Sequence, residues 1–143
     1  MPEGSSARPA ILVSACLLGV CCNHRGQANP SDAVRSLAPR YVLLPVCPES
    51  MGGLATPRPA AEQQLDGRVV TDRGDDVTDA FVRGARATVE VARVAVAREA
   101  VLKARSPSCG EAGVATRALR AAGVTVRTEE DVSSATMEGS AGR

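Results

Sequence analysis

Three short apolar runs, each followed by a cysteine, constrain the fold of this chain more than any other feature. The runs are ILVSA before Cys16, YVLLPV before Cys47, and AVLK, which leads through ARSPS to Cys109. A continuous apolar run of about four to eight residues is typical of a strand buried on both faces. The carboxyl ends of parallel strands share one edge of a sheet, and ligands bind in the crevice there. We therefore expect the three thiols to converge on one spot.

The rest of the chain alternates strand and helix patterns, which indicates an α/β fold. We predict a single compact domain with a mostly parallel sheet, flanked by helices and carrying a small hairpin insertion. Strands are expected at the apolar runs of residues 11–15, 41–46, 100–102 and 124–127. Helices are expected at residues 30–38, 77–96 and 113–122. The hairpin is expected around residues 68–71, which lie between Asp66-Gly67 and Arg73-Gly74.

Two local patterns add detail to this prediction. Asn29 precedes Pro30 and is expected to cap the first helix, which ends before Pro39. The segment CPESMGGLATPRPA, residues 47–60, contains three prolines and two adjacent glycines. It is therefore expected to be an ordered loop without a regular element. Because this loop follows a strand end, functional residues are expected in it.

Length and composition narrow the class of protein. The 143 residues are expected to form one domain over the whole chain, with a folded core at about 9–133 and mobile tails at 1–8 and 134–143. A net charge of +1 and only two aromatic residues, Tyr41 and Phe81, indicate no nucleic-acid partner. The apolar runs are too short to cross a membrane. We predict a cytoplasmic protein with reduced cysteines, which favours metal or catalytic roles for them.

Three converging thiols carry an electrostatic cost. Two thiolates about 4 Å apart repel by about 4 kcal/mol at an effective dielectric constant near 20, so three of them need a cation or stay protonated. Three cysteines around a cubane iron–sulfur cluster leave one iron open, where it can bind substrate as a Lewis acid. Two alternatives remain open at this point. Cys16, Cys47 and Cys109 could pack as small hydrophobes, or could bind zinc together with His24, the only histidine.

Polar residues beside these cysteines could carry chemistry. Glu49 lies two residues after Cys47 and could act as a general acid or base, or be a solvated loop carboxylate. In SPSCG, Ser106 or Ser108 could orient water or substrate, or cap the following helix. Arg58 could recognise a carbonyl or an anion, or remain solvated at the surface. Two adjacent thiols of the first loop are interpreted as packing residues or incidental thiols: Cys21 and Cys22.

Three motifs occur in a specific order along the chain: SACLLG at 14–19, PVCPE with GGL and TPRP at 45–59, and LKARSPSCG at 102–110. Together they resemble the 2-thiouracil desulfidase (TudS) family, first catalogued as a domain of unknown function. The resemblance implies a 4Fe-4S cluster on Cys16, Cys47 and Cys109. It also implies an enzyme that removes sulfur from thiolated pyrimidine bases, with Glu49 and Ser106 as catalytic residues.

The implied reaction is the hydrolysis of a small thiolated base such as 2-thiouracil. The substrate sulfur is expected to bind the open iron, which stabilises it as a leaving hydrosulfide while water adds to the carbon. Glu49 would move the protons and Ser106 would hold water or substrate in line. The alternative class is a non-enzymatic iron–sulfur protein, either a redox sensor or a sulfur carrier.

Two segments depart from the pattern of that family. After CLLG the family usually carries a basic-Tyr-Asp-Gly tetrad, whereas this chain has Asn23-His24-Arg25-Gly26. Family members also usually carry an aromatic, glycine-rich stretch before the last helix, whereas here Cys109-Gly110-Glu111 leads almost directly into it. If that stretch lines the pocket, these departures predict a different or larger thiolated substrate, or a loss of turnover.

Overall fold

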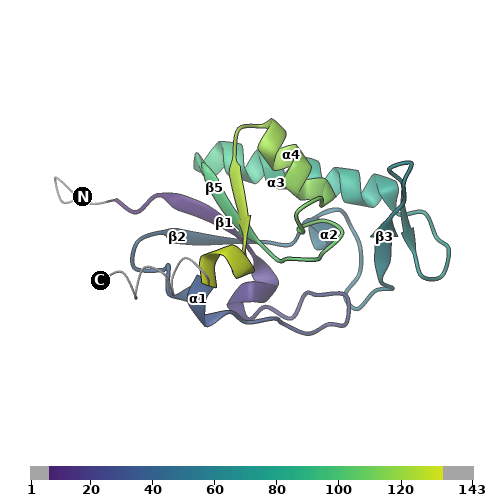
Figure 1. Cartoon of the computed structure of the whole chain (residues 1–143), viewed down its shortest axis with the longest axis horizontal. Coiled ribbons are helices and arrows are strands. Elements are labelled where there is room, and N and C mark those ends of the chain that lie inside the picture. Colours follow the sequence, from purple (N-terminus) through teal and green to yellow (C-terminus); the bar gives the residue numbers. More distant parts are fainter. Residues whose placement is uncertain (1–6, 134–143) are drawn as a thin grey trace.

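The computed structural model describes residues 7–133, which form an α/β fold around a four-stranded sheet (Figure 1). The strand order is β2-β1-β5-β6, and each neighbouring pair is parallel. The strands are β1 (Ala10–Ser14), β2 (Val42–Val46), β5 (Glu99–Leu102) and β6 (Thr125–Thr128). The predicted fold class is confirmed. The predicted tails at 1–8 and 134–143 lie outside the described residues, apart from Ala7 and Arg8.

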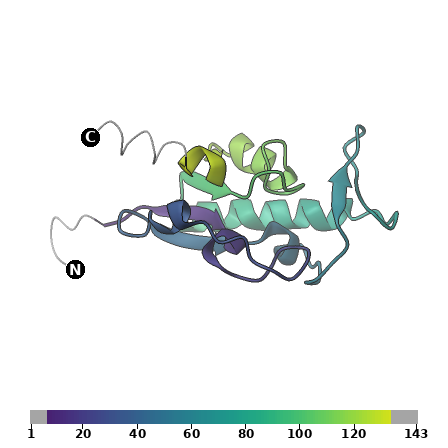
Figure 2. The same ribbon diagram turned by 60° about the horizontal axis from the view of Figure 1, so that its bottom comes forward.

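Helices cover both faces of this sheet (Figures 1 and 2). They are the 3₁₀ helix η1 (Ala15–Leu18), α1 (Asp32–Arg35), α2 (Pro48–Met51), α3 (Thr78–Ala95) and α4 (Val114–Ala121), and residues 129–133 are also helical. Side chains of β1 alternate between the two faces. Leu12 packs into the core beneath α3 and α4, whereas Ile11 and Val13 pack with Val34 of α1 and with Val132. The sheet therefore separates two apolar cores.

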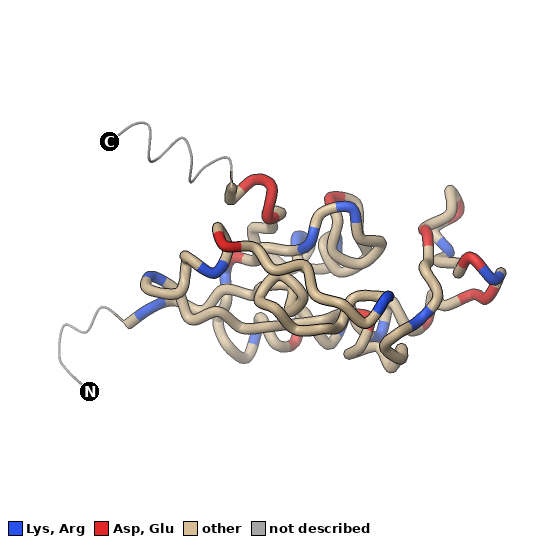
Figure 3. The backbone as a smooth tube through the Cα atoms, turned by 90° about the horizontal axis from the view of Figure 1, so that it is seen from below, with Lys and Arg blue, Asp and Glu red and all other residues tan. Residues whose placement is uncertain are grey.

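A hairpin of β3 (Ala61–Gln63) and β4 (Val69–Thr71) stands beyond the end of the sheet in Figures 1 and 2. The predicted hairpin is confirmed, and its first strand precedes Asp66-Gly67. The backbone N–H of Val69 donates to Thr78 Oγ1 at 2.9 Å, which ties the hairpin to the start of α3. Figure 3 shows Lys and Arg interspersed with Asp and Glu along the backbone. Within residues 7–133, no helix is both long and apolar enough to cross a membrane.

Two sequence predictions about helix starts are wrong. Asn29 does not cap the first helix: Ser31 does, because its Oγ accepts the backbone N–H of Val34 at 3.3 Å. The N–H of Asn29 instead donates to the carbonyl of Cys16 at 2.9 Å. Residues 47–60 are also not irregular throughout, because Pro48 opens α2 at the first helical turn. Proline suits that position, since its fixed φ is helical and it has no N–H to leave unpaired.

A close contact between two glycines places α2 against α3. A Cβ added to Gly84 would lie 1.8 Å from the carbonyl oxygen of Pro48, and one added to Gly52 would lie 2.0 Å from that of Ala80. Arg83 also donates to the carbonyl of Gly52 at 3.0 Å. Two backbones can approach this closely only where neither carries a side chain. The glycine contact therefore sets the position of α2 relative to the sheet.

We predict that Gly84→Ala destabilises the protein. In an exposed helix this change would stabilise by about 1 kcal/mol, because alanine has the higher helix propensity. Here the clash with α2 outweighs that gain, and we expect a net loss of about 2 kcal/mol in the free energy of unfolding. Chemical denaturation measures it. Ala87→Gly, on the same helix, should cost about 1 kcal/mol, and a Gly84→Ala protein more stable than wild type would contradict the packing described.

Candidate functional site

A cavity of about 450 Å³ lies at the carboxyl edge of the sheet, where β1, β2 and β5 end. Its walls come from four segments that are distant in sequence. They are residues 14–29, 46–49, 58–62 and 103–109. The parallel register explains this convergence, because Ser14 pairs with Val46 and Val13 pairs with Val101. The strands therefore deliver the chain to the same edge.

The three cysteines singled out in the sequence all line this cavity. Cys16 lies in η1 directly after β1, and Cys47 caps the N-terminus of α2 directly after β2. Cys109 lies in the loop between β5 and α4. Cys16 and Cys109 are buried and Cys47 is half-buried, and none of the three forms a disulfide. The structure therefore brings the three thiols to one cavity, as expected from the sequence.

Burial and nearby negative charge both oppose ionisation of the two buried thiols, Cys16 and Cys109. Burial raises the pKa of the Cys109 thiol to about 11, and the negative charges of Glu49 and Cys16 act in the same direction, against hydrogen bonds with Ser14 and Ser108. Burial also raises the pKa of Cys16, a hydrogen bond with Asn29 opposes this, and the nearby Cys47 adds to it. Without a cation, these two thiols keep their protons at neutral pH.

A fourth thiol, Cys22, also lines the cavity. Its pKa is raised to about 12, first by burial and then by the negative charge of Cys47. The Cys47 thiol lies 3.7 Å from the carbonyl oxygen of Cys22. Cys22 is half-buried at the cavity wall beside Cys47, and its interpretation as a packing or incidental thiol stays a prediction. Its neighbour Cys21 is exposed and does not line the cavity. This position is compatible with the interpretation of Cys21 as an incidental thiol.

The cysteines are not grouped for a single ion. Zinc bonded to sulfur at about 2.3 Å would bring its tetrahedral ligands to within about 4 Å of one another. Among residues 7–133, no group of three or more His, Cys, Asp or Glu side chains is placed to hold a metal ion. His24 is exposed on the wall of the cavity. A polynuclear cluster, in contrast, places each thiolate on a different iron and so needs a wider spacing.

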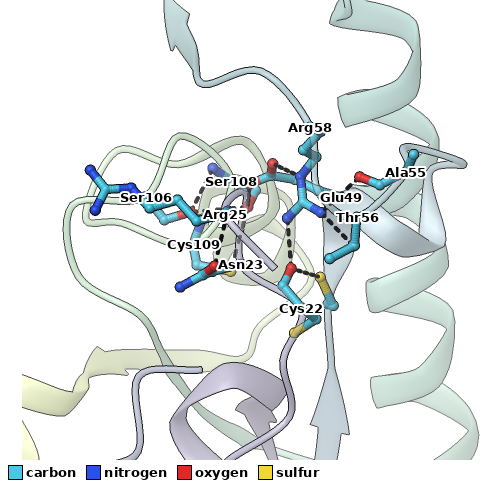
Figure 4. A network of polar contacts seen from close by, with 11 residues as sticks. Cys22, Asn23, Arg25, Glu49, Ala55, Thr56, Arg58, Ser106, Ser108 and Cys109 are labelled. Atoms are coloured by element: carbon cyan, nitrogen blue, oxygen red, sulfur yellow. Dashed lines mark hydrogen bonds and ion pairs between the residues drawn. The ribbon is translucent and has the colours of Figure 1, made fainter. Parts of the chain in front are cut away.

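Glu49 is held at both of its carboxylate oxygens. Its Oε1 accepts the Nε–H of Arg58 at 2.8 Å, and its Oε2 accepts the hydroxyl of Ser108 at 3.0 Å (Figure 4). The side chains of Glu49 and Arg58 are only 13% and 7% exposed. A buried ion pair needs such additional hydrogen bonds to offset the cost of removing its charges from water. Glu49 is therefore an oriented carboxylate and not a solvated loop residue.

Four of the five N–H donors of Arg58 bond to other groups of the protein. Beyond Glu49, its guanidinium donates to the carbonyl of Cys22 at 2.9 Å, to Thr56 Oγ1 at 2.9 Å and to the carbonyl of Ala55 at 3.2 Å. The expectation that Arg58 remains solvated at the surface is therefore wrong, because its side chain is only 7% exposed. Recognition of a ligand carbonyl or anion by Arg58, which lines the cavity, stays a prediction. Its rigid fork of donors joins the first loop, α2 and the TPRP loop.

Ser106 and Glu49 do not contact each other directly. Ser106 Oγ accepts the backbone N–H groups of Ser108 and Cys109 at 3.3 and 3.2 Å, and it lies 3.1 Å from Ser108 Oγ. Ser108 bridges to Glu49. The sequence placed both hydroxyls beside Cys109, and the family resemblance assigned a catalytic role to Ser106. Neither indicated that Ser108 is the serine that contacts Glu49, because this contact depends on how two loops distant in sequence pack.

Comparison with known proteins agrees with this fold and cavity. The family model for 2-thiouracil desulfurase matches residues 11–138, and the chain belongs to this family. It is similar to [4Fe-4S]-dependent thiouracil desulfidase TudS, with a TM-score of 0.81 and 36% sequence identity over 93% of this chain and 99% of that chain. It is also 38% identical over 109 residues to the uncharacterized protein YbbK of Bacillus subtilis (strain 168), covering 70% of this chain and 72% of that protein.

We predict that Arg58→Met lowers the free energy of unfolding by about 3 kcal/mol, because it leaves the buried charge of Glu49 without its partner. The double variant Arg58→Met/Glu49→Gln should recover part of this loss, since it removes both charges. Chemical denaturation of the three proteins measures the effect. As a control, Arg68→Met breaks an ion pair that is 58% exposed on each side and should change stability little. An equal response at the two arginines would contradict the importance assigned to burial.

Proposed function

We propose that this protein is an iron–sulfur-dependent desulfidase that hydrolyses the thiocarbonyl group of a thiolated pyrimidine base, with 2-thiouracil as the reference substrate. Cys16, Cys47 and Cys109 would hold a 4Fe-4S cluster. The observation that carries the proposal is that three thiols from three separate strand ends line one cavity beside an oriented glutamate. Membership of the 2-thiouracil desulfurase family and the likeness to the [4Fe-4S]-dependent TudS support it.

The chemistry of the donor set fits this cofactor. Thiolates are the ligands that iron–sulfur clusters take in proteins. The pKa of both buried thiols, Cys16 and Cys109, is raised by burial and by neighbouring negative charge. A positively charged metal group would relieve that repulsion, because thiol ligands lose their protons when they bind metal. None of the three cysteines is committed to a disulfide.

When bound, a three-cysteine cluster supplies one iron without a protein ligand, which can act as a Lewis acid toward sulfur. The protein side chains supply proton transfer and orientation. Hydrolysis converts C=S and water into C=O and hydrogen sulfide, so it needs no oxidant or reductant. Glu49 would accept a proton from the attacking water and return one to the departing sulfur. Its oxygens keep lone pairs for this purpose beyond those used by Arg58 and Ser108.

Ser106 would orient the water or the substrate at the cavity wall. It is half-buried and lines the cavity. Its oxygen is fixed by the backbone N–H groups of Ser108 and Cys109, which leaves its position set before substrate binds. General acid–base groups positioned in this way contribute about 10²- to 10⁴-fold in rate.

The substrate we propose includes molecules larger than a free base. A cavity of about 450 Å³ lies within the usual range for small-molecule sites. Only residues 111–113 separate Gly110 from the start of α4 at Val114. The short connection supports an open mouth beside Cys109. Parallel assays with 2-thiouracil and its nucleoside distinguish the two sizes of substrate.

Cluster binding gives the first prediction for this function. Anaerobic reconstitution should yield a brown protein with about four iron and four sulfide per chain. Cys16→Ala, Cys47→Ala and Cys109→Ala should each reduce the iron content, because each removes one thiolate ligand. Cys21→Ala is the matched control, since Cys21 is exposed and outside the cavity, and it should bind as much iron as wild type. A colourless wild-type protein would overturn the proposal.

Turnover gives the second prediction. Glu49→Gln should release sulfide from 2-thiouracil about 10²-fold more slowly than wild type, because an amide cannot accept the proton. Its iron content should be unchanged. Glu62 also lines the cavity, and Glu62→Gln should retain turnover. Full activity in Glu49→Gln would remove Glu49 from the mechanism. Retained sulfide without formation of uracil in the wild-type protein would instead favour the non-enzymatic sulfur carrier.

A further inference from the structure

The second serine of the SPSC motif occupies a position that the proposed mechanism does not yet use. Ser108 is 2% exposed and lies between the two polar groups to which that mechanism assigns the chemistry. We propose that Ser108 is a positioning residue whose hydroxyl links Ser106 to Glu49 and relays a proton between them. This inference rests on the proposed desulfidase function, because Glu49 and Ser106 take their roles from it.

The hydrogen-bond directions follow from counting protons. The Ser108 hydroxyl has one proton and three polar neighbours: Glu49 Oε2 at 3.0 Å, Ser106 Oγ at 3.1 Å and Cys109 Sγ at 3.6 Å. An ionised carboxylate only accepts hydrogen bonds, and charge-assisted bonds are the stronger ones. Ser108 therefore donates to Glu49. The 3.1 Å contact with Ser106 is then a bond in which Ser108 accepts.

Ser106 is arranged to donate in that contact. Its oxygen already accepts two backbone N–H groups, from Ser108 and Cys109. A hydroxyl oxygen has two lone pairs, so both are engaged and its proton points to another acceptor. The Ser108 oxygen is that acceptor, at 3.1 Å. The chain of donors thus runs in one direction, from Ser106 through Ser108 to Glu49.

The position of Ser108 is fixed by its backbone as well as by burial. Its carbonyl accepts the N–H groups of Ala115 at 2.9 Å and Thr116 at 3.3 Å, at the start of α4. The backbone of Ser108 is therefore anchored to a helix, whereas Ser106 is half-buried and lies on the wall of the cavity. A relay needs its central group to stay in place while its ends exchange protons with substrate and solvent. Burial and anchoring give Ser108 that property.

The relay step balances without any redox partner. The longer of the two N–H contacts to Ser106 Oγ, the one from Ser108 at 3.3 Å, is released as the attacking water binds, which frees one lone pair. The water gives its proton to this lone pair, Ser106 gives its own proton to Ser108 Oγ, and Ser108 gives its own to Glu49 Oε2. Three O–H bonds break and three form, and both serines end with the proton count with which they began. Glu49 becomes a neutral carboxylic acid, which can later protonate the departing sulfur.

The test compares cluster-loaded Ser108→Ala, Ser108→Thr and Thr116→Val with wild type. We expect Ser108→Ala to lower kcat for 2-thiouracil about tenfold or more and to leave KM and iron content unchanged. Ser108→Thr restores the hydroxyl and should recover most of kcat. Thr116→Val is the matched control, because Thr116 is also buried and donates to the carbonyl of Cys109 at 3.0 Å without joining the chain of donors. It should keep the kcat of wild type.

A second measurement separates a relay from a merely structural role. In mixtures of H₂O and D₂O, transfer of several protons gives kcat a curved dependence on the deuterium fraction, and Ser108→Ala should make it linear. Equal kcat losses in Ser108→Ala and Thr116→Val, or a loss that follows iron content, would overturn the relay. The relay would also be overturned if Ser108→Ala had the same kcat as an active wild-type protein. A cluster-loaded wild type that releases no sulfide overturns the proposed function and the relay together.

Discussion

Parallel pairing of β1 with both β2 and β5 is the constraint on which the site depends. In this arrangement all three strands end at one edge, so the chain leaves Ser14, Val46 and Leu102 toward the same cavity. An antiparallel partner at either position would send one segment to the opposite edge. Cysteines placed after these strands therefore meet although they are far apart in sequence. Helices pack on both faces of the sheet and bury its apolar side chains in two cores.

The cavity brings together thiols and a carboxylate that repel one another, and one of the basic residues in its wall, Arg58, is buried. Burial and nearby negative charge raise the pKa of Cys109, and Glu49 is one source of that charge. Arg58 pairs with Glu49 and also holds the carbonyl of Cys22. The same guanidinium thus orients the carboxylate and fixes the loop that carries the fourth thiol. Arg58 pairs with Glu49, whereas the positive side chain that acts on the Cys16 thiol is Lys103, whose charge lowers the pKa of Cys16 against the larger effect of burial.

Several elements could be predicted because their signals are local. The helix α3 follows from apolar residues at helical spacing, and β1 and β2 follow from short apolar runs between turn residues. The start of α1 and the existence of α2 were predicted wrongly, because Asn29 and Ser31 both suit a cap and a proline-rich segment also suits a loop. Ser31 is the cap because its hydroxyl accepts the N–H of Val34, whereas the side chain of Asn29 bonds with Cys16. Such choices depend on contacts outside the local window.

By itself, the sequence determined the alternation of the main strands and helices, the parallel sheet and the three cysteines that follow its strands. These properties arise from periodicity and from the short connections that parallel strands allow. Only the tertiary structure decided which polar groups meet. Ser108 contacts Glu49 across 59 positions of the chain, and Arg58 contacts Cys22 across 36. Hydrogen bonds of this kind have no signal in the sequence, because they depend on how the packed loops approach one another at the edge of the sheet.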